Sequence, residues 1–230
     1  METESNIVKG YTDAYGKACK ELALGRTDEI CMNAAVTCNE TENAYSVRYL
    51  NKNYSINAIT GEVGLYGSED EVPITVRVLL LHYLINSGNK PLTGNMISFR
   101  DLKNGASIYY PAFRKRAVTP LVKAFGSDIE RLYECSAILN GEKEKYGSAS
   151  ATIRVLPMVP VTFVLWKGDE EFEASGNILF DSSVENFLSA EDIVYAGSFG
   201  VYELIRLKNV IFSDAKREKA GWRDEDSRIR

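Results

Sequence analysis

The sequence contains a single histidine, His82, among its 230 residues. This excludes zinc sites built on two or three histidines, and the HExxH motif of metalloproteases is absent. A Ser–His–Asp or Cys–His catalytic arrangement would have to use His82, which lies in an apolar segment with helical spacing. A histidine in that setting is more often a hydrogen-bonded core residue. We therefore keep His82 as a candidate acid or base and favour the structural interpretation.

The cysteines provide no metal-binding spacing. They are Cys19, Cys31, Cys38 and Cys135, and no two of them form a C-x-x-C pair. We therefore expect reduced, unbridged thiols and neither structural zinc nor an iron–sulfur cluster. The GxGxxG, Walker A and GxSxG motifs are also missing, so no motif identifies a nucleotide, a cofactor or a serine nucleophile.

Long apolar runs and an excess of positive charge are missing as well. The longest apolar run, residues 74–85, is interrupted by Arg77 and His82 and is too short to span a bilayer. The N-terminal segment is polar and lacks the parts of a secretory signal. A net charge of −5 argues against a surface built broadly for nucleic-acid phosphates. We expect a cytoplasmic protein whose partner is neither a nucleic acid nor a membrane.

The clearest pattern that is present lies between residues 159 and 192. Residues 161–166, VTFVLW, form a β-branched and aromatic run typical of a strand covered on both faces. A Lys-Gly-Asp turn follows, and strict alternation from residue 172 predicts a second strand with Glu171 and Glu173 exposed. The two strands together predict a β-hairpin. Its expected buried side chains are Phe163, Leu165, Phe172, Ile178 and Phe180.

Helical spacing predicts several helices around this hairpin. Residues 6–24 are amphipathic, whereas residues 72–86 are apolar nearly all round. A helix without a polar face is normally buried on most sides, so residues 72–86 are the expected central helix. Further predicted helices cover residues 112–125, 127–139 and 190–207.

Two capping boxes precede helical segments near the end of the chain. Ser182 with Glu185 predicts the start of a short helix, and Ser189 with Asp192 predicts the start of the last long one. Small residues within that last helix, Gly197 among them, predict the close approach of another backbone segment.

The remaining strand patterns complete the expected fold. Residues 44–50 and 54–59 are strand-like and joined by a turn, and residues 33–37 are a further candidate strand. Helices and strands occur in blocks without regular βαβ alternation, which favours an α+β protein. We expect an antiparallel sheet built from hairpins and packed against a buried central helix and several amphipathic helices.

Composition divides the chain into three parts. Residues 1–32 form an N-terminal helix and connection, and residues 33–207 form the main α+β domain. Residues 208–230 form a charged C-terminal tail. After Asp214, charges of both signs dominate, and we expect that part of the tail to be poorly ordered.

Seven segments resemble a known family. They are LHYL at 81–84, PLTG at 91–94, ISFRDL at 97–102, YPAFR at 110–114, PLVKAFG at 120–126, WKGDEEF at 166–172 and LFD at 179–181. In this order and at these spacings, the chain from about residue 33 to 206 resembles the domain of unknown function numbered 3786, a family of anaerobic bacteria and archaea. The resemblance implies an anaerobic setting and no defined activity. Some relatives carry a cysteine-rich segment and look like iron–sulfur proteins, but this chain lacks that segment.

The family-like segments place five candidate ligand-binding residues at the ends of elements or in loops, where binding residues concentrate. They are Arg100, Tyr110, Arg114, Trp166 and Asp169. The two arginines could each donate paired hydrogen bonds to a carboxylate or phosphate, and Trp166 offers a stacking surface. The alternative is that both arginines pair with nearby carboxylates and stabilise the fold.

Acidic residues of the hairpin offer a different kind of site. Asp169, Glu170, Glu171, Glu173 and Asp181 supply the oxygen ligands that Mg²⁺ and Ca²⁺ prefer. Their spacing does not match a calcium-binding loop, so a solvated turn and strand face is the favoured interpretation and we assign no metal.

These observations favour a non-catalytic binding or accessory protein of anaerobic metabolism. Its expected partner is a small anionic ligand or another protein, and the anaerobic setting comes from the resemblance alone. One alternative is an enzyme that uses the acidic hairpin, residues 169–173, with a divalent metal, or His82 as acid or base. Another is a purely structural interaction protein. The sequence identifies no cofactor.

Overall fold

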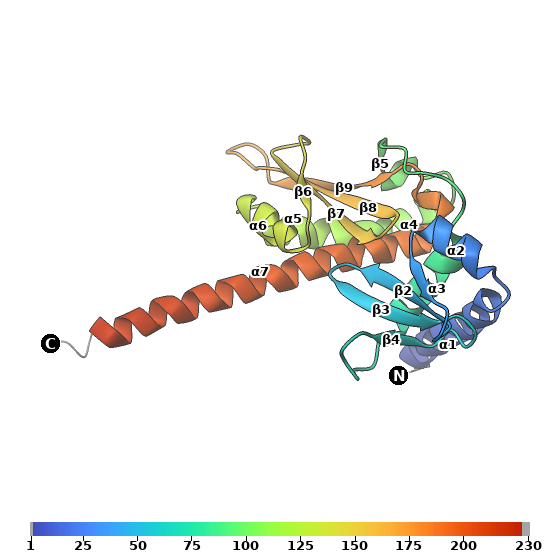
Figure 1. The fold of residues 1–230 in the computed structure, drawn as a ribbon. Helices are drawn as coiled ribbons and strands as arrows, with labels where there is room; N and C mark the ends of the chain where they lie inside the picture. The colour runs from blue at the N-terminus through green and yellow to red at the C-terminus, as the bar shows by residue number, and fades with distance from the viewer. Residues whose placement is uncertain (1, 227–230) are drawn as a thin grey trace.

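The protein folds into two antiparallel sheets and a set of helices (Figure 1). The structure is a computed structural model that describes residues 2–226, with side chains described for residues 9–211. Two antiparallel sheets with separate helices confirm the predicted α+β class. The hairpins are distributed over two sheets, however, and not over the one sheet that the sequence predicted.

The smaller sheet has four strands in sequential order. They are β1 (Thr37–Asn39), β2 (Ala44–Tyr49), β3 (Lys52–Asn57) and β4 (Val63–Leu65). β2 and β3 form the predicted hairpin, with Tyr45 opposite Ile56. Tyr45, Val47 and Ile56 are buried, so one face of this sheet contributes to the core.

The larger sheet has five strands in the order β5-β9-β8-β7-β6. They are β5 (Met96–Ser98), β6 (Glu142–Lys143), β7 (Ala149–Leu156), β8 (Val159–Trp166) and β9 (Ser175–Asp181). β8 and β9 form the hairpin expected from the sequence, with Phe163 opposite Ile178. Phe163, Leu165, Ile178 and Phe180 are all buried, as predicted.

Phe172 is an exception to that prediction, because its side chain is 70% exposed. The Asp169 carboxylate accepts hydrogen bonds from the backbone N–H groups of Glu171 (2.9 Å) and Phe172 (2.8 Å). This side-chain turn uses residues that the alternating pattern assigned to the strand, so β9 begins only at Ser175. Glu171 and Glu173 are exposed, as expected.

Seven α-helices surround the sheets in the described residues. They are α1 (Glu2–Leu22), α2 (Thr27–Ala34), α3 (Ile74–Asn86), α4 (Ala106–Phe113), α5 (Thr119–Phe125), α6 (Glu130–Ile138) and α7 (Ala190–Asp226). α3 is the predicted central helix, and its middle turns, including Leu80 and Leu81, are buried.

Two local predictions need correction. The strand expected at residues 33–37 begins only at Thr37, because α2 continues to Ala34 and ends at Ala35 in the left-handed conformation (φ 50°). The helix expected from residue 112 begins at Ala106 and includes Pro111. A π-helical turn, Arg114–Val118, then joins α4 to α5 directly. Proline favours a helix start but does not require one, so it is an imprecise boundary signal.

α7 is much longer than the sequence indicated. It runs from Ala190 to Asp226, and its C-terminal half extends away from the body of the protein (Figure 1). The segment predicted to be poorly ordered is therefore helical as far as Asp226, and residues 227–230 lie outside the described residues. Alanine, lysine, arginine and glutamate dominate residues 215–220, and these are good helix formers.

Aromatic rings pack against Gly197 and Gly200 of α7, whereas the sequence predicted that another backbone segment would approach there. A β-carbon at Gly197 would lie 2.9 Å from the ring of Phe113, and one at Gly200 would lie 2.8 Å from the ring of Phe163. Both rings are fully buried. The two glycines therefore allow α7 to pack tightly on the larger sheet and on α4.

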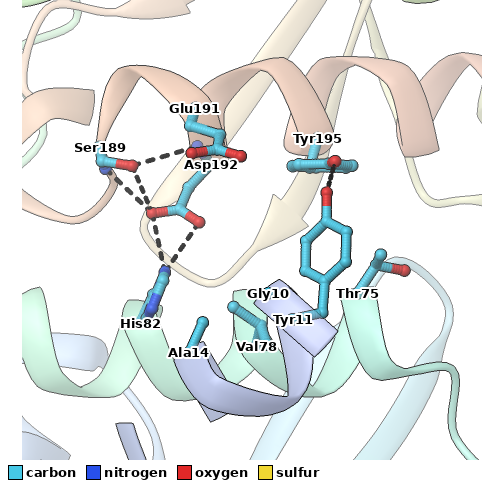
Figure 2. A pocket seen from close by; sticks show the side chains of 10 residues that line it. All are labelled: Gly10, Tyr11, Ala14, Thr75, Val78, His82, Ser189, Glu191, Asp192 and Tyr195. Carbon is cyan, nitrogen blue, oxygen red and sulfur yellow. Dashed lines mark hydrogen bonds and ion pairs between the residues drawn. The ribbon is translucent and has the colours of Figure 1, made fainter. Parts of the chain in front are cut away.

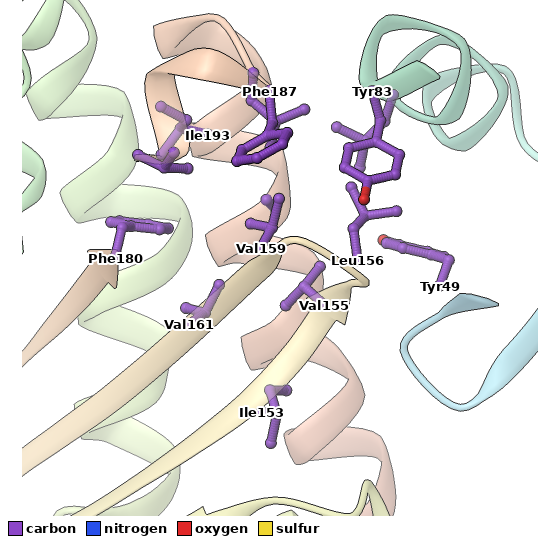
Figure 3. Close-up of a cluster of buried hydrophobic side chains, with 14 of the residues drawn as sticks. Tyr49, Tyr83, Ile153, Val155, Leu156, Val159, Val161, Phe180, Phe187 and Ile193 are labelled. Carbon is purple, nitrogen blue, oxygen red and sulfur yellow. The ribbon is translucent and has the colours of Figure 1, made fainter. Parts of the chain in front are cut away.

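The two sheets share one hydrophobic core, part of which is shown in Figure 3. The backbone N–H of Leu50 donates a 2.8 Å hydrogen bond to the carbonyl of Val155, which links the β2–β3 hairpin to β7. The hydroxyl of Tyr83 on α3 donates to the Ala34 carbonyl (2.6 Å) and accepts from the Met158 N–H (3.0 Å). α3 is thereby bonded to the end of α2 and to the turn between β7 and β8.

Candidate functional site

A cavity of about 320 Å³ lies where α1, α3 and the first turns of α7 meet (Figure 2). α1 supplies a small-residue wall and one phenol, α3 supplies the only histidine, and α7 supplies most of the polar groups. The lining residues are Gly10, Tyr11, Ala14, Thr75, Val78, His82, Ser189, Glu191, Asp192 and Tyr195. Three segments that are distant in the sequence therefore form one polar cavity.

An ion pair between His82 and Asp192 is the central feature of this cavity. His82 Nδ1 lies 2.9 Å from Oδ1 and 3.1 Å from Oδ2 of Asp192. The Asp192 side chain is 7% exposed and that of His82 is 31% exposed, so the carboxylate is buried while the imidazole reaches the cavity. Within the described residues, Nε2 of His82 has no hydrogen-bond partner.

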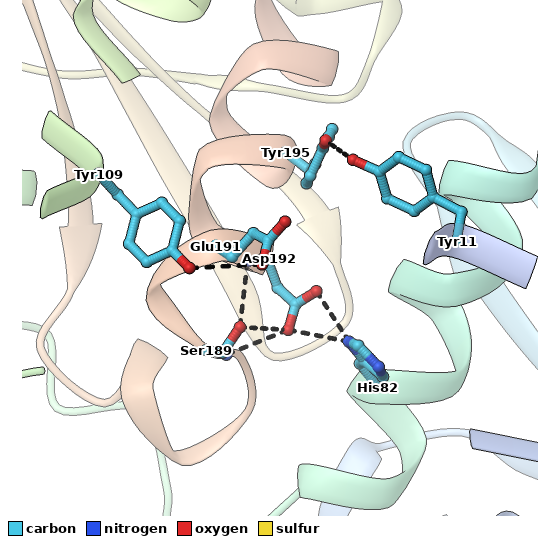
Figure 4. A network of polar contacts seen from close by, with 7 residues as sticks. All are labelled: Tyr11, His82, Tyr109, Ser189, Glu191, Asp192 and Tyr195. Atoms are coloured by element: carbon cyan, nitrogen blue, oxygen red, sulfur yellow. Dashed lines mark hydrogen bonds and ion pairs between the residues drawn. The ribbon is translucent and has the colours of Figure 1, made fainter. Parts of the chain in front are cut away.

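Ser189 completes the contacts of the Asp192 carboxylate, as Figure 4 shows. Its hydroxyl donates to Oδ2 of Asp192 (2.6 Å) and accepts from the Asp192 N–H (3.2 Å), while the Ser189 N–H donates to the same carboxylate (3.3 Å). This is the capping box predicted from the sequence. The order of contacts is serine to aspartate to histidine, so His82 does not activate Ser189 as the base of a catalytic triad would.

The hydrogen bond that His82 donates to the Asp192 carboxylate raises the pKa of His82 above its ordinary value, and the effect outweighs the opposing cost of burial. The negative charges of Asp192, Glu191 and Glu21 contribute in the same direction. A larger share of His82 is therefore protonated near neutral pH than for a free histidine. In that form, Nε2–H is a hydrogen-bond donor at the cavity.

Tyrosines form the other side of the cavity. The hydroxyls of Tyr11 and Tyr195 are in hydrogen-bond contact, and the Arg116 guanidinium donates to the Tyr195 hydroxyl (3.3 Å). Burial and the contact with Tyr195 raise the pKa of Tyr11. The charge of Glu191 raises the pKa of Tyr109, whose hydroxyl lies 3.5 Å from that carboxylate. Both phenols therefore stay neutral at physiological pH.

Of the five residues proposed as a ligand site, Arg100 and Tyr110 are in direct contact. The Arg100 guanidinium lies 4.1 Å from the centre of the Tyr110 ring. Arg114 is exposed on the π turn. Trp166 is 43% exposed at the end of β8, opposite Ser175, whereas β5, which precedes Arg100, pairs with the other end of β9. Neither arginine forms an ion pair within the described residues, so the carboxylate pairing offered as the alternative is not observed either.

The acidic residues of the hairpin do not converge on one point. Asp169 shapes the turn before β9, while Asp181 ends that strand. The carboxylate of Asp181 is buried and accepts hydrogen bonds from the N–H groups of Thr93 (3.1 Å), Gly94 (2.7 Å) and Ser183 (2.9 Å). Burial alone would raise the pKa of Asp181, but these bonds lower it. Among the residues that the structure describes, no group of three His, Cys, Asp or Glu side chains is arranged to hold a metal ion.

Sequence reasoning named His82 but missed its partners as parts of a site. Asp192 and Ser189 were identified only as a helix cap, and Tyr11 and Tyr195 were not identified as site residues. One signal was available, because a polar ring in an apolar helix needs a hydrogen-bond partner when it is buried. The four cysteines are free thiols.

Comparisons with known proteins identify a family and no individual relative. No curated protein and no solved structure gives a significant match to the chain. In the described part of the chain, no helix combines the length and apolar character needed to cross a bilayer. The model of one family, described as a domain of unknown function (DUF3786), matches residues 27–203, from the start of α2 into α7. The chain belongs to this family, as the resemblance of its sequence segments predicted.

Proposed function

We propose that this protein binds a small polar molecule in the cavity between α1, α3 and α7. One observation supports the proposal above the others: a histidine fixed at Nδ1 by a buried carboxylate presents its unpartnered Nε2 edge at a cavity. A cavity of about 320 Å³ lies within the range usual for small-ligand sites. The proposal keeps the function class that the sequence favoured, a binding protein, and moves the site away from Arg100 and Arg114.

The charges of the cavity indicate which ligand it accepts. Protonated His82 offers a donor, whereas the exposed carboxylate of Glu191 is an acceptor and repels anions. Tyr11 and Tyr195 add neutral hydroxyls and ring edges. The best ligand is therefore a compact molecule with an acceptor oxygen for Nε2 of His82 and an ammonium or hydroxyl group for Glu191. Free amino acids and small polyols have this pattern.

The single histidine makes a direct test available. Protein labelled with ¹⁵N in the histidine ring gives ring signals from His82 alone, so a panel of amino acids and polyols is screened for compounds that shift Nε2. We expect saturable binding of at least one compound, with a larger shift at Nε2 than at Nδ1. A panel that leaves both nitrogens unchanged contradicts the proposal.

A matched pair of variants, one on α1 and one just after its end, provides the control. Ala14→Phe places a ring in the cavity and should abolish the response, because Ala14 lines the cavity wall. Ala23→Phe adds the same ring at an exposed position after the helix and should leave binding unchanged. Equal binding by both variants would place the ligand elsewhere.

Acid–base catalysis is a second candidate function, favoured by the carboxylate that orients the imidazole. A carboxylate on Nδ1 fixes the ring and stabilises its protonated form, which are the conditions for proton transfer at Nε2. A binding protein leaves its ligand unchanged, whereas an enzyme converts it. Proton NMR of a bound compound during prolonged incubation separates the two, and conversion should disappear in His82→Gln.

A further inference from the structure

A second cavity, of about 470 Å³, lies between the two sheets on a different part of the protein. The ends of α2 and α6, the strand β2 and the β7–β8 turn form its walls. The lining residues are Ala35, Arg48, Leu139, Asn140, Arg154, Leu156, Pro157 and Met158. Two of them are arginines and none is acidic, although the whole chain has a net charge of −5.

Both arginines retain unused hydrogen-bond donors. Arg48 donates to the Leu50 carbonyl (3.2 Å) and to the Asn51 side chain (3.2 Å), and Arg154 donates to the Pro157 carbonyl (3.1 Å). A guanidinium has five N–H groups, so most of the donors remain available. Neither arginine forms an ion pair within the part of the chain that the structure describes. Both are exposed, so binding of an anion would not require burial of an unpaired charge.

The floor of the cavity is apolar. Leu139 and Leu156 are buried, and Met158 is half-buried beside them. Two guanidinium groups above such a floor match a molecule with a doubly charged head and an apolar body. Arginine recognises phosphate with paired N–H donors in a planar fork, and two arginines balance the charge of a phosphate monoester dianion.

We propose that this cavity, which we call the arginine cleft, binds the phosphate of a small organic phosphate monoester between Arg48 and Arg154, with its apolar part against Leu156 and Met158. The cleft is separate from the His82 cavity and shares no lining residue with it. In a purely structural role, the two arginines would only donate hydrogen bonds to the backbone carbonyls of Leu50 and Pro157 and to the side chain of Asn51. That role uses only a minority of their donors and explains neither the absence of acidic lining residues nor the apolar floor.

The methyl group of Met158 provides a probe inside the cleft. Protein labelled with ¹³C at the methyl groups of its four methionines is titrated with phenyl phosphate, with inorganic phosphate and with uncharged benzyl alcohol, and Met158→Leu assigns the signal. We expect a saturable Met158 shift with phenyl phosphate, weaker binding of inorganic phosphate and little response to benzyl alcohol. An unmoved Met158 signal, or equal binding of benzyl alcohol, overturns the proposal.

Arginine variants distinguish this cleft from the site that the sequence suggested. Arg48→Gln and Arg154→Gln should each weaken phenyl phosphate binding about tenfold or more, because each loses charge-assisted hydrogen bonds. Arg100→Gln and Arg114→Gln are matched controls and should bind as the wild type does. If the controls lose binding and the cleft variants keep it, the site lies at Arg100 and Arg114 and the cleft proposal fails.

A variant that keeps both arginines guards against loss of folding. Asn140→Asp adds a carboxylate to the rim of the cleft at an exposed position with a left-handed backbone (φ 55°), which aspartate tolerates. It should weaken phenyl phosphate binding without altering the melting temperature. Unchanged affinity in this variant would contradict a phosphate position between the two arginines.

Discussion

The two cavities of this protein differ in how their charges are compensated. In the His82 cavity, the buried carboxylate of Asp192 holds the histidine and receives two further hydrogen bonds from Ser189. In the arginine cleft, Arg48 and Arg154 are exposed and bonded only to neutral groups. Breaking a buried ion pair destabilises the folded state, because the remaining charge is neither paired nor solvated. An exposed cation contributes little to the free energy of unfolding and remains available for a ligand.

The cavities also differ in their relation to the family match. The arginine cleft is built entirely from residues inside the matched range 27–203. The His82 cavity depends in addition on α1, which supplies Gly10, Tyr11 and Ala14 from outside that range. The ion pair itself lies within the match.

The largest effect is expected in the core that supports α7. Phe180 is fully buried, and a β-carbon at Gly197 would lie 3.4 Å from its ring. Phe180→Ala should cost about 3–5 kcal/mol of unfolding free energy, measured by urea denaturation. Asp192 is on α7, the helix whose Gly197 packs against Phe180. Loss of the Phe180 ring should therefore shift the ring nitrogen signals of His82 more than the methyl signal of Met158. A larger change at Met158 would show that the core supports the cleft instead.

Removal of the carboxylate of the ion pair should have the next largest effect. Asp192→Ala deletes a helix cap and a charged hydrogen bond together, so we expect a loss of about 2–4 kcal/mol. Glu191→Ala, at the exposed neighbouring position, is the control and should change the stability by less than about 0.5 kcal/mol. If both variants lose the same amount, charge at the helix start is the cause and the ion pair is not.

A smaller effect with a defined pH dependence is expected for His82→Gln. The pKa of His82 is raised in the folded state above its unfolded value, so the pair stabilises the protein fully below about pH 6.5, and this stabilisation is lost as the pH rises through the folded pKa. The difference in unfolding free energy between wild type and variant should therefore be larger at about pH 6 than at about pH 9. A difference that grows with pH would contradict a charged pair.

The smallest effect is expected in the arginine cleft. Arg48 is exposed and bonded only to a backbone carbonyl and an amide, so Arg48→Gln should change the unfolding free energy by less than about 0.5 kcal/mol. Phenyl phosphate binding should fall steeply in this variant and, in the wild type, should weaken as salt is added. A stability loss comparable with that of Asp192→Ala would assign Arg48 a structural role.

Local patterns determined several elements without help from the tertiary structure. Alternation and β-branched runs predicted the β8–β9 hairpin, because a strand with one buried face must alternate. The structure added its register, in which Phe163 lies opposite Ile178. The apolar character of residues 72–86 predicted α3 as the buried helix. The spacing of Ser189 and Asp192 predicted the first turn of α7, because a helix start must satisfy its own N–H groups.

Where local signals competed, sequence reasoning chose the wrong one. The alternation through Phe172 suggested a buried strand residue, but the carboxylate of Asp169 binds two backbone N–H groups and holds the chain in a turn there. The charges after residue 214 suggested poor order, whereas the helix of α7 continues through residues with good helix propensity.

Periodicity and composition were sufficient to predict an α+β protein with a buried α3 and a histidine on that helix that needs a hydrogen-bond partner. They did not determine the partner, because His82 and Asp192 are 110 residues apart and local patterns carry no information over such a distance. The same holds for Arg48 and Arg154, which come from different sheets. Only the packing of α1, α3 and α7 brings His82 to Asp192, and only the packing of the two sheets brings Arg48 and Arg154 to one cavity. In the first case burial of the carboxylate requires a compensating partner, whereas the exposed arginines need none.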